Sequence, residues 1–361
     1  MKQPALGLAA SLLVIAVALG FISLFAGPTF MGWVAYCTIC FIPMEVVIGI
    51  TWGTNHPAFA GSRSQPAKGL LLILVSLAAG AVVAVVHFFL VGAGAAPPPP
   101  MAAQCIITSV ITTFWFAVMF GGWPFVNLIK NPVAAGLSLL AACYVVNYLL
   151  FQLLFNYSFM QGAPVYVAAA DPHGLFNAWN VLVFEMAALA VLFLVLNFDL
   201  WPFTKSPAVM CQPVLGLVWT TAALVIGGLA YYLGVTVGGM DVVAFMVQVP
   251  IPFIFGTIIV LNMFQGSLFG KFEQPLRGIL NSLAALVIGE LLARAYGALA
   301  PMVTGTVNPG PPAYEYEIWL ASALLGVTFP FLIFFAEFFR MWPLQRAAAL
   351  AAREQAASGR A

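Results

Sequence analysis

The sequence predicts an all-α polytopic membrane protein of about ten transmembrane helices, arranged as repeated parallel helix pairs. Three observations predict this fold: the composition, a series of apolar runs, and a motif that returns along the chain. Of the 361 residues, 63% are hydrophobic and 6% are charged, whereas about a quarter of the residues of a soluble domain are charged. No water-soluble fold could cover this much apolar surface, so we expect the chain to lie in a lipid bilayer.

Ten apolar runs follow one another, and each is long enough to cross about 30 Å of hydrocarbon at about 1.5 Å per residue. We expect one transmembrane domain over residues 1–343, followed by a cytoplasmic tail at 344–361. A short helix on the membrane surface and a solvated tail are equal alternatives for that tail. The expected helices cover residues 6–26, 30–51, 69–92, 104–122, 134–157, 176–198, 214–236, 242–264, 278–299 and 317–340.

The motif Q-P-x-x-G opens three of these runs, at residues 65–69, 212–216 and 274–278, and Asn131-Pro132 with Gly136 is a looser version. Proline in the first turn of a helix loses only a hydrogen bond that the helix start lacks anyway. Glycine three residues later lets a neighbouring helix approach closely. Because every copy opens a helix on the same side, the motif predicts five parallel helix pairs around a central axis, where a pathway or a plugged cavity would lie.

The basic residues predict the orientation. Eleven of the twelve Lys and Arg residues fall at the termini or in alternate links, and the twelfth, Arg294, lies inside an apolar run. The opposite links contain no Lys or Arg. By the positive-inside rule both termini are cytoplasmic, and we expect a multi-pass protein of a bacterial-type cytoplasmic (inner) membrane.

Ionisable side chains inside the apolar runs are the candidate transport or proton-binding residues, because they are costly at membrane depth. Glu45 and Glu185 have no oppositely charged neighbour in the sequence, so we expect each to be protonated or bonded to another helix. Glu290 and Arg294 are four residues apart and can pair on one helix face. With Arg294 as the only buried cation against three buried carboxylates, the interior is expected to be acidic by two charges.

Two further polar residues complete the candidate set. His87 lies near the exterior end of the third run, where a hydrogen-bonded interfacial histidine is the simpler interpretation. Gln248 precedes Pro250 and Pro252, which should break or kink the eighth helix; Pro43 and Pro330 predict kinks in the second and tenth. A broken helix at membrane depth is tolerated against protein or a wet cavity.

These features favour a secondary transporter or channel-like carrier for a small solute, coupled to protons or cations. The alternative is an integral membrane scaffold or anchor subunit of a larger complex, and we do not expect an enzyme. No catalytic residue, metal site or cofactor is expected, although Cys37 and Cys40 have a spacing that could hold a soft metal. The expected partners are the lipid bilayer, an unidentified small solute, and either further copies of the chain or subunits of a membrane complex, with no nucleic acid.

The topology can be tested with reporter fusions. Fusions after residues 65 and 275 should report a cytoplasmic position, and fusions near Pro98 and Pro309 an exterior one, because basic links stay on the cytoplasmic side. Contrary readings at two well-expressed fusions would rule out the ten-helix topology.

Overall fold

A computed structural model describes residues 2–345, so nearly all of the predicted tail lies outside the described residues. Within that part of the chain, ten helices are long and apolar enough to cross a membrane, as the sequence predicts. We number them as spans in chain order: Ala5–Ile22, Gly27–Thr51, Ala67–Leu90, Pro100–Met119, Pro132–Leu154, Ala178–Asn197, Val214–Val237, Val242–Met263, Leu276–Val303 and Glu315–Phe338.

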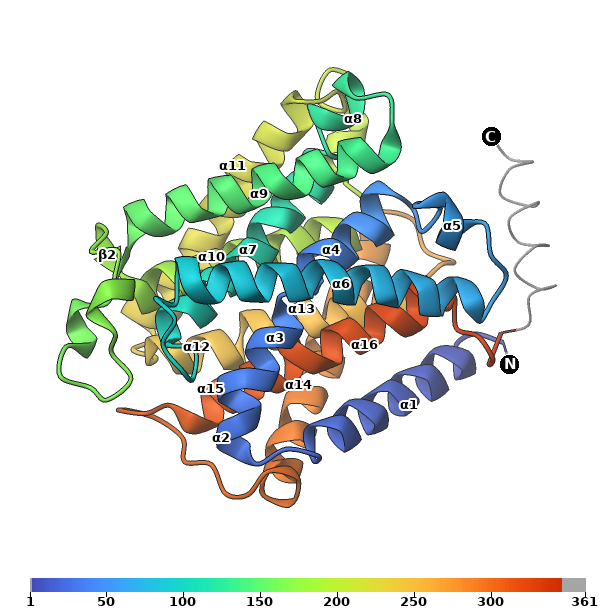
Figure 1. Cartoon of the computed structure of the whole chain (residues 1–361). Helices are drawn as coiled ribbons and strands as arrows, with labels where there is room; N and C mark the ends of the chain where they lie inside the picture. Colours follow the sequence, from blue (N-terminus) through green and yellow to red (C-terminus); the bar gives the residue numbers. More distant parts are fainter. Residues whose placement is uncertain (1, 346–361) are drawn as a thin grey trace.

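Several spans are assembled from shorter helices, and the labels of Figure 1 follow these pieces. Continuous helices form spans 1 (α1), 3 (α6), 5 (α9), 6 (α10) and 9 (α14), with the bounds given above. The composite spans contain α2 (Gly27–Thr29), α3 (Ala35–Ile39), α4 (Ile42–Val46), α7 (Pro100–Phe114), α11 (Val214–Tyr231), α12 (Val242–Gln248), α13 (Pro250–Ile258), α15 (Glu315–Ala321) and α16 (Phe329–Ile333). The links contain α5 (Ala58–Gly61), α8 (Phe125–Leu128) and the two-residue strands β1 (Phe155–Asn156) and β2 (Phe176–Asn177), which pair in parallel.

The ten spans form two layers. In an apolar 18-residue stretch of each span, 56–72% of the residues are buried in the even-numbered spans and 22–39% in the odd-numbered spans. Each even-numbered span contacts the next one, and span 10 contacts span 2, so these five helices close into an inner ring. The odd-numbered spans lie outside it, as α1, α6, α9 and α11 do around α7, α13 and α16 in Figure 1. We call the side that holds residues 2 and 345 the terminal side, and the opposite side the loop side.

The glutamine of each Q-P-x-x-G motif joins the start of an outer helix to the end of an inner one. Gln65 donates from Nε2 to the Phe338 carbonyl at 2.6 Å and accepts at Oε1 from the Gly69 N–H at 3.2 Å. The last carbonyls and the first N–H groups of a helix have no partner inside the helix. One amide side chain therefore satisfies an unpaired group at each of two helix ends.

The same two bonds recur at Gln212, which bonds the Met119 carbonyl and the Gly216 N–H. Gln274 likewise bonds the Asn197 carbonyl and the Gly278 N–H. The sequence analysis missed a further Q-P-x-x-G segment at residues 3–7, where Gln3 bonds the Met263 carbonyl and the Gly7 N–H. Each glycine packs on an aromatic ring at the end of the inner helix: Gly7 on Phe264, Gly69 on Phe339, Gly216 on Phe120 and Gly278 on Phe198.

The looser motif at Asn131 makes the same junction with different groups. The Trp52 indole donates to the Pro132 carbonyl at 2.8 Å, and its ring packs on Gly136. The Asn131 side chain accepts from the N–H groups of Val133 and Ala134 and so caps its own helix.

Four of the five inner spans are irregular; span 6 is a continuous helix, and among the outer spans span 7 ends in a π-helical segment. Span 8 is interrupted at Val249, between α12 and α13, which confirms the break expected at Gln248 and Pro250. Span 2 is interrupted between α3 and α4, just before Pro43. In span 10, π-helical turns lie on both sides of α16, which contains Pro330. Such turns are rare and frequently lie at functional sites.

Replacing Gly216 with leucine tests the junction. A Cβ atom at Gly216 would overlap the Phe120 ring, and overpacking of this kind costs about 1–3 kcal/mol. We expect a lower melting temperature in detergent. Gly20→Leu is the matched control, because nothing lies within 4 Å of a Cβ atom at Gly20. Equal melting of both variants would show that the glycine is not a packing site.

Candidate functional site

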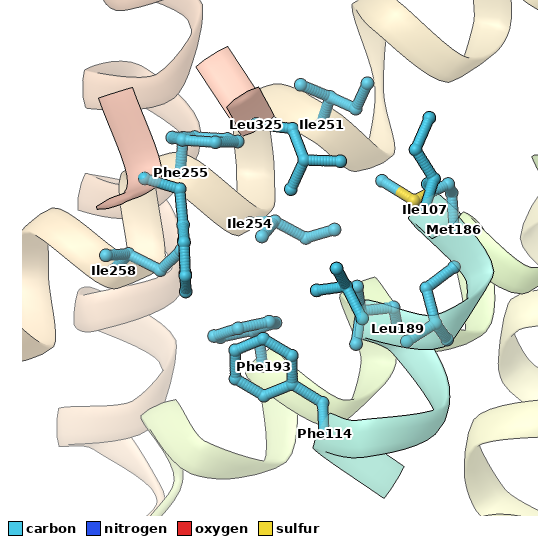
Figure 2. Close-up of a pocket in the computed structure, with 13 residues that line it drawn as sticks. Ile107, Phe114, Met186, Leu189, Phe193, Ile251, Ile254, Phe255, Ile258 and Leu325 are labelled. Atoms are coloured by element: carbon cyan, nitrogen blue, oxygen red, sulfur yellow. The ribbon is translucent and has the colours of Figure 1, made fainter. Parts of the chain in front are cut away.

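An apolar constriction lies where four of the five inner spans meet. Figure 2 shows its side chains converging on one small space. The cavity that remains has a volume of about 20 Å³, room for about one water molecule. It is lined by Ile107, Val110, Ile111, Phe114, Met186, Leu189, Phe193, Ile251, Ile254, Phe255, Ile258, Leu325 and Phe329. These four spans are therefore closely packed around a small apolar cavity.

Glu185 lies next to this constriction on span 6. It is one helical turn before Leu189, and residues four apart share a helix face, so Glu185 is on the face that lines the cavity, toward the loop side. Its Oε2 atom is buried and has no hydrogen-bond partner among the described residues. An ionisable side chain therefore lies one helical turn from a residue that lines the apolar cavity.

Gln248 ends α12 at the interruption of span 8 and its side chain is exposed. Ile251, in the first turn of α13, lines the constriction. The break thus places an exposed amide just on the loop side of the apolar residues of span 8. No hydrogen bond of the Gln248 side chain is recorded within residues 2–345.

Glu45 is the most deeply buried of the candidates, with 0% of its surface exposed. In the described part of the chain neither carboxyl oxygen has a partner at good hydrogen-bond geometry, and the nearest polar side chain is Ser76 of α6, whose hydroxyl donates to the Phe41 carbonyl. Glu45 lies in α4, in the half of span 2 nearer the terminal side, and does not line the constriction. Span 2 therefore contributes an isolated carboxyl group rather than part of the central site.

His87 lies in a separate crevice between spans 3, 4 and 5. The crevice has a volume of about 210 Å³ and is lined mainly by apolar side chains, together with Asn147 and Tyr148. His87 Nδ1 lies 3.2 Å from the Tyr36 hydroxyl, and Nε2 is buried without a partner among the described residues. The expected interfacial histidine is thus bonded through one ring nitrogen only, and it lies away from the axis.

Glu290 and Arg294 form the predicted pair, with Arg294 Nε 2.6 Å from Glu290 Oε1. The expectation that the pair is buried is wrong: the side chains are 44% and 77% exposed on the outer face of α14. The expected interior charge, which counted Arg294 and Glu290 as buried, therefore has to be revised, because neither side chain is in the interior. Lys68, assigned to a link by its sequence position, is instead 7% exposed at the start of α6.

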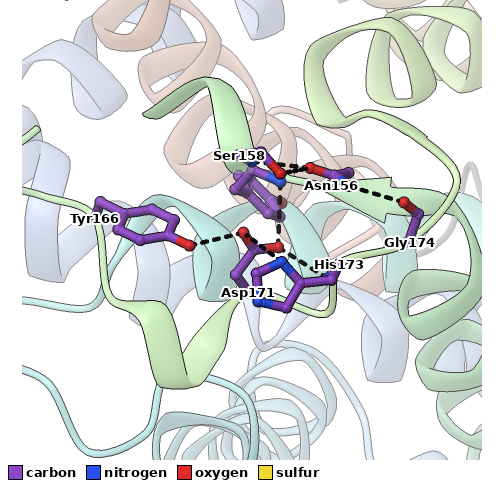
Figure 3. A network of polar contacts seen from close by, with 7 residues as sticks. Asn156, Ser158, Tyr166, Asp171, His173 and Gly174 are labelled. Atoms are coloured by element: carbon purple, nitrogen blue, oxygen red, sulfur yellow. Dashed lines mark hydrogen bonds and ion pairs between the residues drawn. The ribbon is translucent and has the colours of Figure 1, made fainter. Parts of the chain in front are cut away.

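The link between spans 5 and 6 folds over the loop side of the inner ring. In Figure 3 the side chains of Tyr166 and His173 point toward Asp171, which is buried at the centre of the network. The Asp171 carboxylate accepts from the Tyr157 and His173 N–H groups at 3.2 and 2.9 Å and from the Tyr166 hydroxyl at 3.0 Å. Asp171 thus holds the loop in place through these three hydrogen bonds.

Tyr157 connects this loop to the inner spans, because its hydroxyl donates to Gln104 Oε1 at 2.8 Å. Burial raises the pKa of the Tyr157 hydroxyl well above its ordinary value, and negative charge on the nearby Cys105, Asp171 and Glu185 raises it further. The hydroxyl therefore stays neutral. Sequence reasoning missed the hydrogen bond between Tyr157 and Gln104, since residue 157 was assigned to the end of a helix.

The second long link is held by Glu317, which accepts from the Gly310 N–H at 3.1 and 3.2 Å. The Tyr314 hydroxyl donates to Asp241 at 2.8 Å, and burial together with that bond raises the pKa of Tyr314 to about 12. These contacts tie the start of span 10 to the start of span 8 on the loop side.

Replacing each of the two buried glutamates, Glu45 and Glu317, with methionine should have opposite effects on the stability of the protein. Glu45→Met removes a buried carboxyl group that has no partner, so we expect the free energy of unfolding to rise by about 1–3 kcal/mol. Glu317→Met leaves the Gly310 N–H without an acceptor and should lower it by about 1–2 kcal/mol. Thermal unfolding in detergent measures both. A loss of stability in Glu45→Met as large as that in Glu317→Met would mean that Glu45 has a structural partner.

The chain matches no protein-family model, no curated protein and no solved structure. Within residues 2–345, no group of three or more His, Cys, Asp and Glu side chains could hold a metal ion. The constriction and the carboxyl groups described above are therefore the features of the chain that bear on its function.

Proposed function

We propose that the chain is a secondary transporter or channel-like carrier that moves a proton, a small cation or a small neutral solute along the axis of its inner ring. One observation carries the proposal: a narrow apolar constriction is lined by Leu189, and Glu185, one helical turn away, has a buried carboxyl oxygen without a partner. Apolar constrictions can gate a pathway because water leaves them when they narrow. A buried carboxyl group beside one marks an ion or proton pathway.

The constriction describes a closed state, since about 20 Å³ leaves no room for a hydrated solute. Opening it requires the inner spans to move relative to one another. The interruption at Val249 and the π-helical turns lie in or beside the helices that line it, and interruptions of this kind are where helices bend. These irregularities, most of which lie in the inner spans, support an inner layer that can change shape.

Charge favours a cation or a proton over an anion. Away from the span ends, the inner spans contribute the carboxyl groups of Glu45 and Glu185; Glu317 and Glu337 lie nearer the two ends of span 10, and Arg294 lies on an outer face. Keeping two carboxylates ionised in a low-dielectric interior is costly. Cycling between protonated and ionised forms as the pathway opens would couple solute movement to protons.

The finer topology belongs to the same proposal. We place both termini on the cytoplasmic side of a bacterial-type inner membrane, and we treat the five helix pairs as parallel repeats around the axis. The basic links and the recurring glutamine junctions support this arrangement. Repeats related by an axis along the membrane normal occur in other transporters.

A scaffold subunit is the second candidate. The exposed ion pair of Glu290 and Arg294 favours it, because a charged outer face in lipid calls for a covering partner. A scaffold needs no pathway, so measuring flux separates the two functions.

Leu189→Ala tests the pathway directly. Shortening a side chain of the constriction should widen it and raise proton or monovalent-cation flux into proteoliposomes about ten-fold, which corresponds to a barrier lowered by about 1.4 kcal/mol. The matched control is Leu74→Ala, since Leu74 is 58% exposed on the outer helix α6 and its truncation should leave flux unchanged.

Glu185→Gln completes the test, because it keeps the size of the side chain and removes its titration. We expect it to abolish uptake driven by an imposed pH gradient in folded protein. If parent, Leu189→Ala and Glu185→Gln all show the same background flux, the transport proposal is wrong and the scaffold takes its place.

A further inference from the structure

The outer face of α14 carries charges at the depth where a membrane protein can least easily expose them to lipid. We define the α14 face as Leu283, Leu286, Val287, Glu290, Leu291 and Arg294, which recur at helical spacing. Its apolar members are 49–62% exposed, and the side chains of Glu290 and Arg294 are 44% and 77% exposed. All six therefore face outward from the ten-helix bundle.

Contacts on the opposite side of α14 fix the depth of the pair. The backbone at Gly289 packs directly against the Pro252 carbonyl, and Pro252 lies between Ile251 and Ile254, which line the central constriction. Glu290 is fourteen residues after Leu276 and thirteen before Val303, or about 20 Å from either end at about 1.5 Å per residue. The carboxylate is thus at mid-membrane depth.

The long arginine side chain does not resolve the problem by reaching a membrane surface. Arg294 Nε bonds Glu290 Oε1 at 2.6 Å, so the guanidinium points back toward the membrane centre. Arginine residues near helix ends usually extend to the headgroups instead. Pairing neutralises the net charge, yet the remaining donors and the second carboxylate oxygen still face the surroundings, which is costly in hydrocarbon.

We propose that the α14 face is the contact surface of a homodimer in the membrane, with a second copy of this chain as its occupant. A two-fold axis along the membrane normal brings two α14 helices together in parallel. Each Glu290 then lies level with Arg294 of the other copy to within about one helical turn. A guanidinium has five donors and a carboxylate two acceptor oxygens, so the four side chains form a closed network with bonds both within and between chains.

A second copy fits this face better than an unrelated partner. Across a two-fold axis, Glu290 of each copy can pair with Arg294 of the other, so the same two residues supply both halves of the contact. Copies inserted in the same membrane with the same topology also supply the parallel orientation. The exposed Leu and Val side chains around the charges then bury each other around the polar centre.

Disulfide cross-linking in native membranes tests the contact. In a Cys211→Ser background, which removes the exposed native cysteine, Val287→Cys should give a covalent dimer on mild oxidation. Val225→Cys is the matched control, because Val225 is 65% exposed on the outer helix α11 and Val287 60% on α14. No dimer from Val287→Cys, equal dimer from both variants, or capture of a different protein by Val287→Cys would each overturn the proposal.

Charge variants test the network independently. Glu290→Arg places two cations on each face and should weaken dimerisation in lipid vesicles about ten-fold, the scale of one inter-helix polar contact. Glu290→Arg combined with Arg294→Glu restores complementarity and should restore the dimer. Counting photobleaching steps of labelled protein in vesicles measures the dimer fraction.

A further variant keeps this test decisive if Glu290→Arg fails to fold. Combining Glu290→Leu with Arg294→Leu removes both charges without creating a clash of like charges. It should fold and dimerise about ten-fold more weakly than the parent. A monomeric parent, or a dimer fraction that is the same in all folded variants, would show that the α14 face is not the dimer contact.

Discussion

The junction between the start of an outer helix and the end of an inner one is the interaction on which this architecture depends. Helix ends leave N–H and C=O groups without partners, and lipid offers none. At four junctions a glutamine amide donates to an inner carbonyl and accepts from an outer N–H group. The glycine beside it lets the two helices meet at an aromatic ring. Each junction thus fixes the depth of one helix against another.

These junctions, together with the tight contacts between successive spans, separate a regular outer layer from an irregular inner one. The inner spans contain the helix breaks, most of the π-helical turns and the constriction. Irregular backbone is tolerated at membrane depth where protein surrounds it, and the outer helices provide that surrounding. The glutamine junctions lie at one end of the bundle only, on the terminal side. The inner helices can therefore bend near their middles while their terminal-side ends stay in place.

The sequence predicted the helices well because length and apolar composition determine them almost alone: all ten expected runs correspond to spans. Proline chemistry placed the break at Gln248 and Pro250 correctly. The candidate site was less predictable. A helical spacing of four showed that Glu290 and Arg294 pair, but not whether the shared face points inward, because neither face of such an apolar helix is distinctly polar. The Tyr157 contact with Gln104 joins residues 53 positions apart, which no local pattern reveals.

Glu45 and Glu185 show why burial and function must be argued separately. Both carry an unpartnered carboxyl oxygen, and both lie in the inner ring. Glu185 lies one helical turn from Leu189, which lines the constriction, so it is the carboxyl group that the proposed pathway would use. Glu45 is fully enclosed, and a proton could reach it only if spans 2 and 3 separate. Because an unpartnered carboxyl group destabilises the fold, a state of the protein in which Glu45 gained a partner would be stabilised at that position. The same motion that opens the constriction would provide one if it moved α4, just after the interruption of span 2.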